Sequence, residues 1–228
     1  MIRRSLTFCA MPIVMLTIVA CGGKTTEVVT APQIEQYRIA KIAVLPFNVE
    51  RRPTLGQERG YAAPAPPLEA GEQLSDIFYR KLKNWEGIEV IPSYEVQSGM
   101  SIAAGKPLTR PIIKSIGEKL GVDAVLVGTV DVYKERSGSA MGLDRPQDAA
   151  EVGFAVQLIS VRDGVPLWTG QYHERQRPAT EDLSGLLERG PRYLTVEGLA
   201  SSAVDHVLRK FPLGRPSQKQ PGTTQAVQ

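Results

Sequence analysis

The sequence has few of the side chains that most often bind metals or act as nucleophiles. Its 228 residues include two cysteines and two histidines: Cys9, Cys21, His173 and His206. The histidines are far apart in the chain and neither belongs to a His-x-x-x-His pair, so no zinc site of the Cys/His type is expected. We therefore predict no metal centre and no bound cofactor.

The short motifs of hydrolases and nucleotide-binding enzymes are also missing. The chain contains no G-x-S-x-G segment, which is the motif that exposes a nucleophilic serine. The segment GMSIAAGK at 99–106 has five residues between its glycines, and Pro107 follows where a phosphate loop needs Ser or Thr to bind magnesium. These observations predict that the protein is not an enzyme.

A large excess of charge of one sign is absent as well. The chain has 27 Lys and Arg against 24 Asp and Glu, a net charge of +3, and aromatic residues make up 6% of it. A surface that binds nucleic acid combines a basic stripe with aromatic rings that stack on bases. The sequence shows neither pattern, so we expect no nucleic-acid partner.

The longest hydrophobic run lies at the very start of the chain. Arg3 and Arg4 precede a mostly apolar segment that Pro12 interrupts, and this segment is shorter than the about 20 residues that a membrane-spanning helix needs. A charged start, a short apolar segment and small residues before a cleavage point make up an export signal. We therefore assign residues 1–20 as a signal peptide.

The end of this signal, I-V-A-C at 18–21, resembles the bacterial lipobox. The resemblance implies cleavage before Cys21 and acyl chains on its sulfur and its amino group. The alternatives are an ordinary secretory signal that contains a cysteine, or an uncleaved anchor. Because Cys9 leaves with the signal and Cys21 carries lipid, the mature chain would have no free thiol. By resemblance to the enterobacterial sorting rule, Gly22 implies an outer-membrane lipoprotein that faces the periplasm.

Composition divides the rest of the chain into three parts. Residues 21–36 have little apolar periodicity and are predicted to form a lipidated tether. Residues 212–228 are rich in Pro, Gly and Gln, which predicts a disordered tail. Residues 37–211 lie between them and have the size of one domain.

Within this domain, short apolar runs alternate with segments of helical spacing. Strands are expected at 38–47, 88–91, 122–136, 151–161 and 165–175, and helices at 68–86, 109–121 and 193–211. Helices join the first three strands, which predicts that these strands are parallel. The sequence R-D-G at 162–164 predicts a tight turn between the last two strands, and Pro166 is expected to place the last strand at an edge. The predicted fold class is α/β: a single domain with a mixed sheet of about five strands, βαβαβ plus an antiparallel hairpin, flanked by helices.

Several segments together resemble one superfamily of bacterial envelope proteins. These segments are KIAVLPF at 41–47, LSDIFYRKL at 74–82, IEVIPS at 88–93, IGEKLGVDAVLVGTV at 116–130 and FAVQLISVRDGVPLWTGQY at 154–172. The superfamily includes CsgG, LpoB and the amino-terminal domain of TolB, and the resemblance extends over residues 38–176. It implies the α/β fold given above and a role in the cell envelope.

Two polar loops are the candidate binding sites. Residues 51–67 follow the first predicted strand and residues 97–108 follow the second. Ligand sites in open α/β sheets lie at the carboxyl ends of parallel strands, and Arg and Tyr are frequent anchors of protein interfaces. The candidate partner-binding residues are therefore Arg51, Arg52, Arg59, Tyr61 and Lys106.

These expectations combine into a non-catalytic lipoprotein, held at the outer membrane by its acyl chains, whose domain binds another protein in envelope assembly or secretion. The alternative is a subunit of a CsgG-like oligomeric secretion complex, which would make the chain a homo-oligomer. A membrane-crossing hairpin needs strands of about 9–11 alternating residues. The insert at 134–151 is short and charged, so a pore built by this chain is not expected. An envelope hydrolase is the second alternative.

Overall fold

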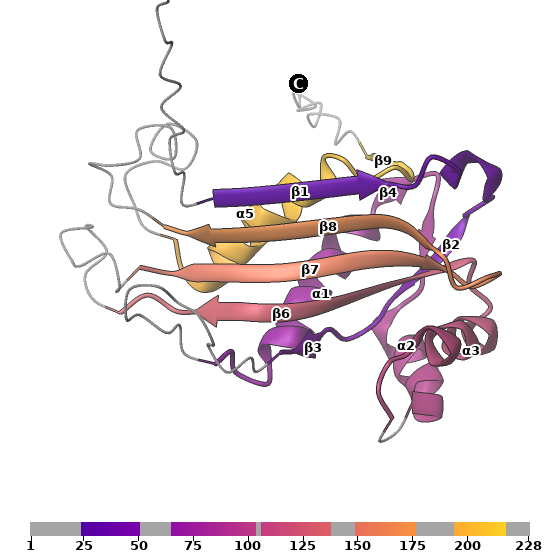
Figure 1. The fold of residues 1–228 in the computed structure, drawn as a ribbon, viewed down its shortest axis with the longest axis horizontal. Coiled ribbons are helices and arrows are strands. Elements are labelled where there is room, and N and C mark those ends of the chain that lie inside the picture. Colours follow the sequence, from indigo (N-terminus) through magenta and orange to yellow (C-terminus); the bar gives the residue numbers. More distant parts are fainter. Residues whose placement is uncertain (1–23, 51–64, 104–105, 138–148, 177–193, 218–228) are drawn as a thin grey trace, which may run out of the picture.

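The computed structural model describes residues 24–50, 65–103, 106–137, 149–176 and 194–217, and a mixed sheet is its central element (Figure 1). The strands lie in the order β1-β8-β7-β6-β2-β5, and β3 pairs with β6 beyond the end of β2. Their bounds are β1 Lys24–Thr30, β2 Lys41–Val44, β3 Asn48–Val49, β5 Glu89–Val90, β6 Ala124–Lys134, β7 Glu151–Ser160 and β8 Pro166–Arg175. The helices are α1 Ala70–Leu82, α2 Ser93–Met100, α3 Arg110–Leu120 and α5 Val196–Leu208, with 3-10 turns at Ile34–Gln36 and Ser101–Ala103.

The pairing of these strands confirms the predicted fold class. β2 is parallel to both β5 and β6, and helices lie between these strands in the sequence, as the crossover rule requires. β6, β7 and β8 are antiparallel neighbours, so the predicted hairpin is present. The sheet has more strands than predicted because it also contains β1 and β3.

The segment predicted to be a tether, residues 21–36, contains the first strand of the sheet instead. β1 pairs antiparallel with β8 along its whole length, from Lys24 opposite Glu174 to Thr30 opposite Trp168. Its sequence, KTTEVVT, is mostly polar because every one of its side chains is exposed or only half-buried. An edge strand of this kind leaves little apolar periodicity in the sequence.

β1 also changes the position of β8, which the sequence predicts to lie at an edge. β8 lies between β7 and β1 in the interior of the sheet, so that prediction is wrong. Pro166 is the first residue of β8, a position where a strand tolerates the missing backbone N–H.

Several element ends differ from the predicted ones. The first helix ends at Leu82, and Trp85–Glu86 form a short strand, β4. β4 pairs with β9, Arg215–Pro216, so the start of the predicted disordered tail is ordered. Residues 97–108, predicted to be a loop, contain the end of α2 and a 3-10 turn. By contrast, α3 confirms the predicted helix, and Gly121 ends it with a left-handed φ of 62°.

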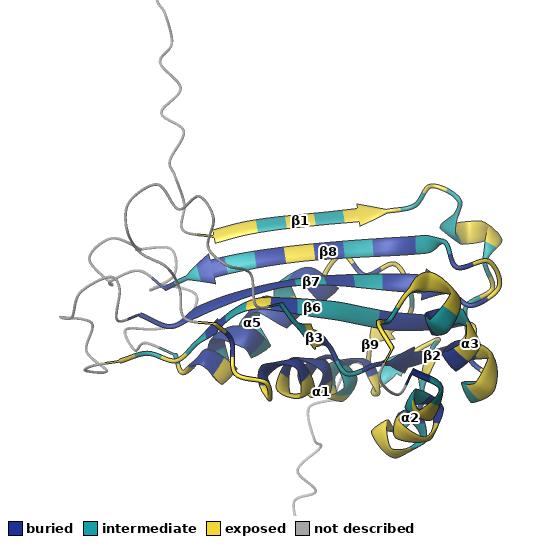
Figure 2. Ribbon diagram, turned by 60° about the horizontal axis from the view of Figure 1, so that its bottom comes forward, coloured by how far each residue is buried: buried dark blue, intermediate teal, exposed yellow. Residues whose placement is uncertain are grey.

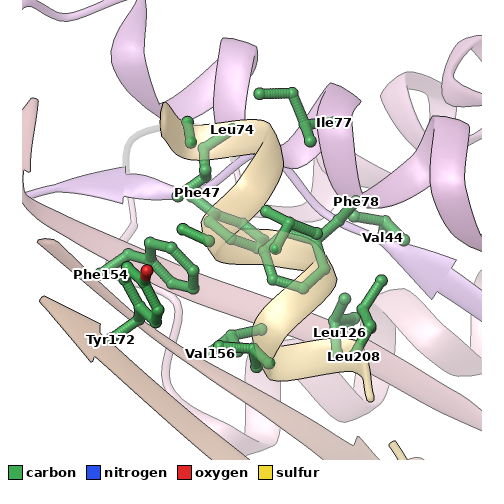
Figure 3. Close-up of a cluster of buried hydrophobic side chains, with 14 of the residues drawn as sticks. Val44, Phe47, Leu74, Ile77, Phe78, Leu126, Phe154, Val156, Tyr172 and Leu208 are labelled. Carbon is green, nitrogen blue, oxygen red and sulfur yellow. The ribbon is translucent and has the colours of Figure 1, made fainter. Parts of the chain in front are cut away.

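Two hydrophobic cores lie on opposite faces of the sheet. α1 and α5 cover one face, while α2 and α3 cover the part of the other face formed by β2, the start of β6 and the end of β7 (Figures 1 and 2). In the larger core, Phe47, Phe78, Phe154 and Tyr172 form a chain of ring contacts with centroids 5.4 to 5.8 Å apart (Figure 3). Among the described elements, no helix covers the longer part of the second face, which β6, β7 and β8 form and which we call the uncovered face, although Glu151 and Gly153 of β7 are buried on it.

The sheet has two ends that carry different structures. At one end, Lys24 of β1 pairs with Glu174 of β8, and Glu151 of β7 lies between Lys134 and Arg175. We call this the β1-start end. The turn that joins β7 to β8 and the first 3-10 turn lie at the opposite end (Figure 1), which we call the β7–β8 turn end. The ten residues of β8 separate the two ends by about 30 Å, at about 3.3 Å per residue.

Candidate functional site

Most residues that the sequence predicts to act at a site lie outside the described ranges. These are the lipidation candidate Cys21 and the partner-binding candidates Arg51, Arg52, Arg59 and Tyr61. Lys106 is described: it is exposed, and its backbone N–H donates to the Ala103 carbonyl oxygen at 2.9 Å. The roles of these residues therefore stay predictions.

The described ends of the two predicted loops meet at one hollow on the uncovered face of the sheet. Asn48 and Glu50 precede the first loop, Leu108 and Arg110 lie at and just after the end of the second, and all four line a hollow of about 340 Å³. We call it the α3 hollow, because it lies between the start of α3 and the strands β6 and β7. The backbone N–H of Glu50 donates to the Val130 carbonyl oxygen at 2.9 Å, which holds this side of the hollow on β6.

Phe47 fixes the segment that carries Asn48 and Glu50. Its side chain is buried in the larger core, on the opposite side of the sheet from the hollow. Gly128 of β6 makes room for it, since a Cβ at position 128 would lie 2.5 Å from the Phe47 ring. A side chain at this point would push the ring away, so Gly128 allows the Phe47 ring to pack against β6.

The α3 hollow has an apolar floor and a polar rim. Ile113 and Ile159 are buried residues of the floor, and Val127 between them is half-buried. Glu50 and Arg110 bring opposite charges to the rim. An apolar centre inside a polar rim is the usual composition of a protein-binding surface. In the described part of the chain, no group of three or more His, Cys, Asp or Glu side chains could hold a metal ion.

A second candidate surface lies at the β7–β8 turn end. The Tyr37 hydroxyl donates to Oδ2 of Asp163 at 2.7 Å, and the guanidinium carbon of Arg162 lies 4.2 Å from the centroid of the Tyr37 ring. The hydrogen bond from Tyr37 lowers the pKa of Asp163. Tyr37 and Arg162 line a hollow of about 420 Å³ together with Asp123. Asp123 accepts from the backbone N–H groups of Ala40 and Lys41, at 2.9 and 2.8 Å.

Three ionisable side chains form a cluster at the β1-start end that the sequence did not predict. Nε2 of His173 lies 3.0 Å from Oε1 of Glu151, and Arg175 donates to Oε2 of Glu151 at 2.9 and 3.0 Å. Burial would raise the pKa of the Glu151 carboxyl, but the hydrogen bond from His173 and the charge of Arg175 outweigh burial and lower that pKa. The same hydrogen bond raises the pKa of His173. The cluster therefore acts as an ion-paired link between β7 and β8.

A third hollow, of about 620 Å³, lies beside the ends of α1 and α5 and is rich in basic side chains. Arg80 pairs with Asp76 at 3.2 Å, and Lys81 pairs with Asp205 at 2.7 Å. Cations in the last turn of a helix offset the helix dipole. Helix stabilisation and these ion pairs therefore account for Arg80 and Lys81.

No protein-family model matches the sequence, and no curated protein does either. Several solved structures are similar to the chain. A PelC dodecamer from Paraburkholderia phytofirmans is 16% identical, with 81% of this chain and 94% of that chain covered and a TM-score of 0.46. The lipoprotein GNA1162 from Neisseria meningitidis is 22% identical, with 75% and 99% covered and a TM-score of 0.42. The LpoB C-terminal domain from Salmonella enterica is 14% identical, with 61% and 85% covered and a TM-score of 0.36.

LpoB is one of the proteins that the sequence resembles, and its C-terminal domain is among these similar structures. The similarity is weak, with all three identities at or below 22% and all three TM-scores below 0.5. Neither an activity nor a partner of this chain follows from it.

Proposed function

We propose that this chain is a non-catalytic lipoprotein that is anchored at the outer membrane, faces the periplasm and binds another envelope protein through the α3 hollow. Acylation of Cys21 provides the anchor. Each buried methylene of an acyl chain contributes about 0.8 kcal/mol, so two or more chains hold a protein on a bilayer stably. The bound protein would act in envelope assembly or secretion.

The α3 hollow is the observation that carries the binding role. The hollow is lined by residues at the described ends of both loops that the sequence predicts to bind a partner, 51–67 and 97–108. Its floor and rim have the composition of a protein-binding surface, and the adjoining face of β6, β7 and β8 extends it. Arg110 is exposed at the rim and is expected to contact the partner. Arg51, Arg52, Arg59, Tyr61 and Lys106 are proposed to extend this contact.

Photo-crosslinking in cells tests the location of the site. One variant carries a photoreactive residue in place of Arg110, and a control variant carries it in place of Lys83, which is exposed after α1 on the opposite face of the sheet. We expect one protein adduct of defined mass from position 110 and none of that mass from position 83. The same adduct from both positions, or from position 83 alone, would contradict the proposed site.

A second experiment tests the predicted loop residues. The double variant Arg59→Ala/Tyr61→Ala is expected to recover less of the crosslinked partner from envelope extracts than the parent protein. Arg110→Ala is the matched comparison inside the described hollow. Unchanged recovery with the double variant but reduced recovery with Arg110→Ala would remove Arg59 and Tyr61 from the site and keep the hollow.

The alternative function, a subunit of an oligomeric secretion complex, is favoured by the outer edge of β1. Within the described residues, β1 has a strand partner on one side only, which is β8. An unpaired edge can accept a strand from a neighbouring copy or from another protein. The mass of the detergent-extracted protein distinguishes the two functions: a large closed ring supports the complex, and a monomer excludes it.

A further inference from the structure

We propose that the β1-start end of the sheet rests on the membrane surface and that the strands point away from it. This orientation depends on the acylation of Cys21 in the proposed function. Its first premise is the short distance along the chain between the lipid and the fold. β1 begins at Lys24, so only Gly22 and Gly23 separate the strand from Cys21. Three Cα–Cα steps span at most about 11 Å, which is much less than the about 30 Å between the two ends of the sheet.

The second premise is that β1 is a fixed part of the sheet. All seven residues of the strand pair with β8. The pairing continues beyond it, since the backbone N–H of Ala31 donates to the Leu167 carbonyl oxygen at 2.9 Å. Val28 packs against the larger core, and the Lys24 ammonium lies 5.9 Å from the centroid of the Tyr172 ring. Holding Lys24 near the bilayer therefore holds the whole sheet there.

Lys24 lies at a corner of the sheet, so two arrangements would satisfy the short linker. In the first, the outer edge of β1 lies along the membrane. This arrangement would take water away from a row of backbone N–H and C=O groups that have no strand partner in the described structure. Unsatisfied backbone groups are costly wherever water is removed, so this arrangement is disfavoured.

In the second arrangement, the ends of the strands meet the membrane. There the backbone groups are paired between strands, as in the pairs Lys24 with Glu174 and Glu151 with Arg175. Lys24 and Lys134 are long cationic side chains at this end, and such side chains keep their charge among lipid phosphates while their stems lie along less polar surface. The structure therefore favours contact through the β1-start end.

This orientation decides which surfaces a soluble partner can reach. Tyr37 and Arg162, at the β7–β8 turn end, stand about 30 Å further from the bilayer than Lys24 does. The α3 hollow and the uncovered face of β6, β7 and β8 lie along the side of the upright sheet and do not face the bilayer. The protein reaches no further than its own length, so its partner must come close to the same membrane.

Fluorescence quenching on vesicles tests the orientation. The acylated mature protein is reconstituted in vesicles of phosphatidylethanolamine and phosphatidylglycerol that carry a short-range quencher on a fraction of their headgroups. Because the mature chain has no free thiol, a single added cysteine gives one labelled position. Thr25→Cys reports on the β1-start end, and Glu35→Cys reports on the opposite end; both residues are exposed. We expect quenching at position 25 to be several-fold stronger than at position 35.

An insertion provides the matched control. A flexible Gly/Ser segment of fifteen residues between Gly23 and Lys24 allows an r.m.s. span of about 20 Å without changing β1, and it should abolish the difference between the two labels. Equal quenching in the parent protein, or an unchanged difference after the insertion, would overturn the orientation while the anchor stands. An unmodified Cys21 in the mass spectrum, with protein that does not float with vesicles, would overturn the anchor and the orientation together.

Discussion

Gly71 of α1 lies directly against the backbone of Phe47. A Cβ at position 71 would lie 2.0 Å from the Phe47 carbonyl oxygen, a distance that no real Cβ adopts. The contact sets α1 close to the segment between β2 and β3, and this segment carries Asn48 and Glu50 to the α3 hollow. The absence of a side chain at one helix position therefore helps to place the candidate site.

Gly71→Ala should lower the free energy of unfolding by about 1–3 kcal/mol, because overpacking must move either α1 or the backbone of Phe47. Gly198→Ala in α5 is the control: the nearest atom to its added Cβ would be 3.4 Å away, an ordinary contact. Helix propensity predicts that this change stabilises the protein by up to about 1 kcal/mol. Urea unfolding of the form without signal peptide and with Cys21→Ser measures both. Equal effects of the two substitutions would mean that the contact with Phe47 is not the cause.

Two threonines at helix starts offer a second comparison. The Thr195 hydroxyl accepts from the Gly198 backbone N–H at 3.2 Å at the start of α5, whereas the Thr109 side chain makes no such bond at the start of α3. Thr195→Ala should therefore cost about 0.5–2 kcal/mol of stability, and Thr109→Ala should cost clearly less. The same urea unfolding measurements test this. A larger loss from Thr109→Ala would contradict the capping assignment.

The pair formed by Glu151 and His173 predicts a dependence of stability on pH. The pKa of His173 is raised above its ordinary value of 6.5 by the Glu151 hydrogen bond, and Asp131 raises it further while Arg175 opposes this. The stabilisation from His173 is therefore complete below about pH 6.5 and is lost as the pH rises through the raised pKa. The pKa of Glu151 is lowered from 4.5, so its contribution is present above that pH and is lost as the pH falls through the lowered pKa.

Stability measured against pH should therefore contain a component from this pair that is largest between about pH 4.5 and 6.5. His173 is 43% exposed, so solvent screening keeps its share at or below about 1 kcal/mol. His173→Gln should remove the decline of this component above pH 6.5 and weaken the acid limb, because only Arg175 then acts to lower the pKa of Glu151. A variant with the same pH profile as the parent protein on the alkaline side would exclude His173 as the group responsible.

The sequence predicts those parts of the fold in which side-chain pattern and burial agree. α3 has an apolar stripe and a closing glycine, and β6 is a dense apolar run, so both are predicted correctly. β1 is not, because an edge strand with no buried side chain needs no apolar pattern. Its presence in turn makes the predicted edge position of β8 wrong.

For the candidate site too, the sequence predicts what the topology specifies and does not predict what depends on strand register. That two loops should meet near the carboxyl ends of parallel strands follows from topology alone, and their described ends do meet at the α3 hollow. The contact between Glu151 and His173 depends on the register between β7 and β8. Local sequence does not specify that register, so the cluster becomes visible only in the structure.

Tyr133 of β6 carries a buried hydroxyl group that makes no hydrogen bond in the described structure. Burial raises its pKa to about 12, and the charges of Glu197 and Glu135 add to this effect. An unpaired buried hydroxyl is destabilising, so Tyr133→Phe should raise the free energy of unfolding by about 1 kcal/mol.

Tyr37→Phe is the matched comparison for Tyr133→Phe, because it removes a hydroxyl that does have a partner. The Tyr37 hydroxyl donates to Asp163 at 2.7 Å, and its loss should lower stability by up to about 1.5 kcal/mol. The same chemical change is thus expected to have opposite signs at the two positions, and urea unfolding of both variants measures the signs directly. A loss of stability in Tyr133→Phe would contradict this prediction and would show that the Tyr133 hydroxyl has a hydrogen-bond partner in solution.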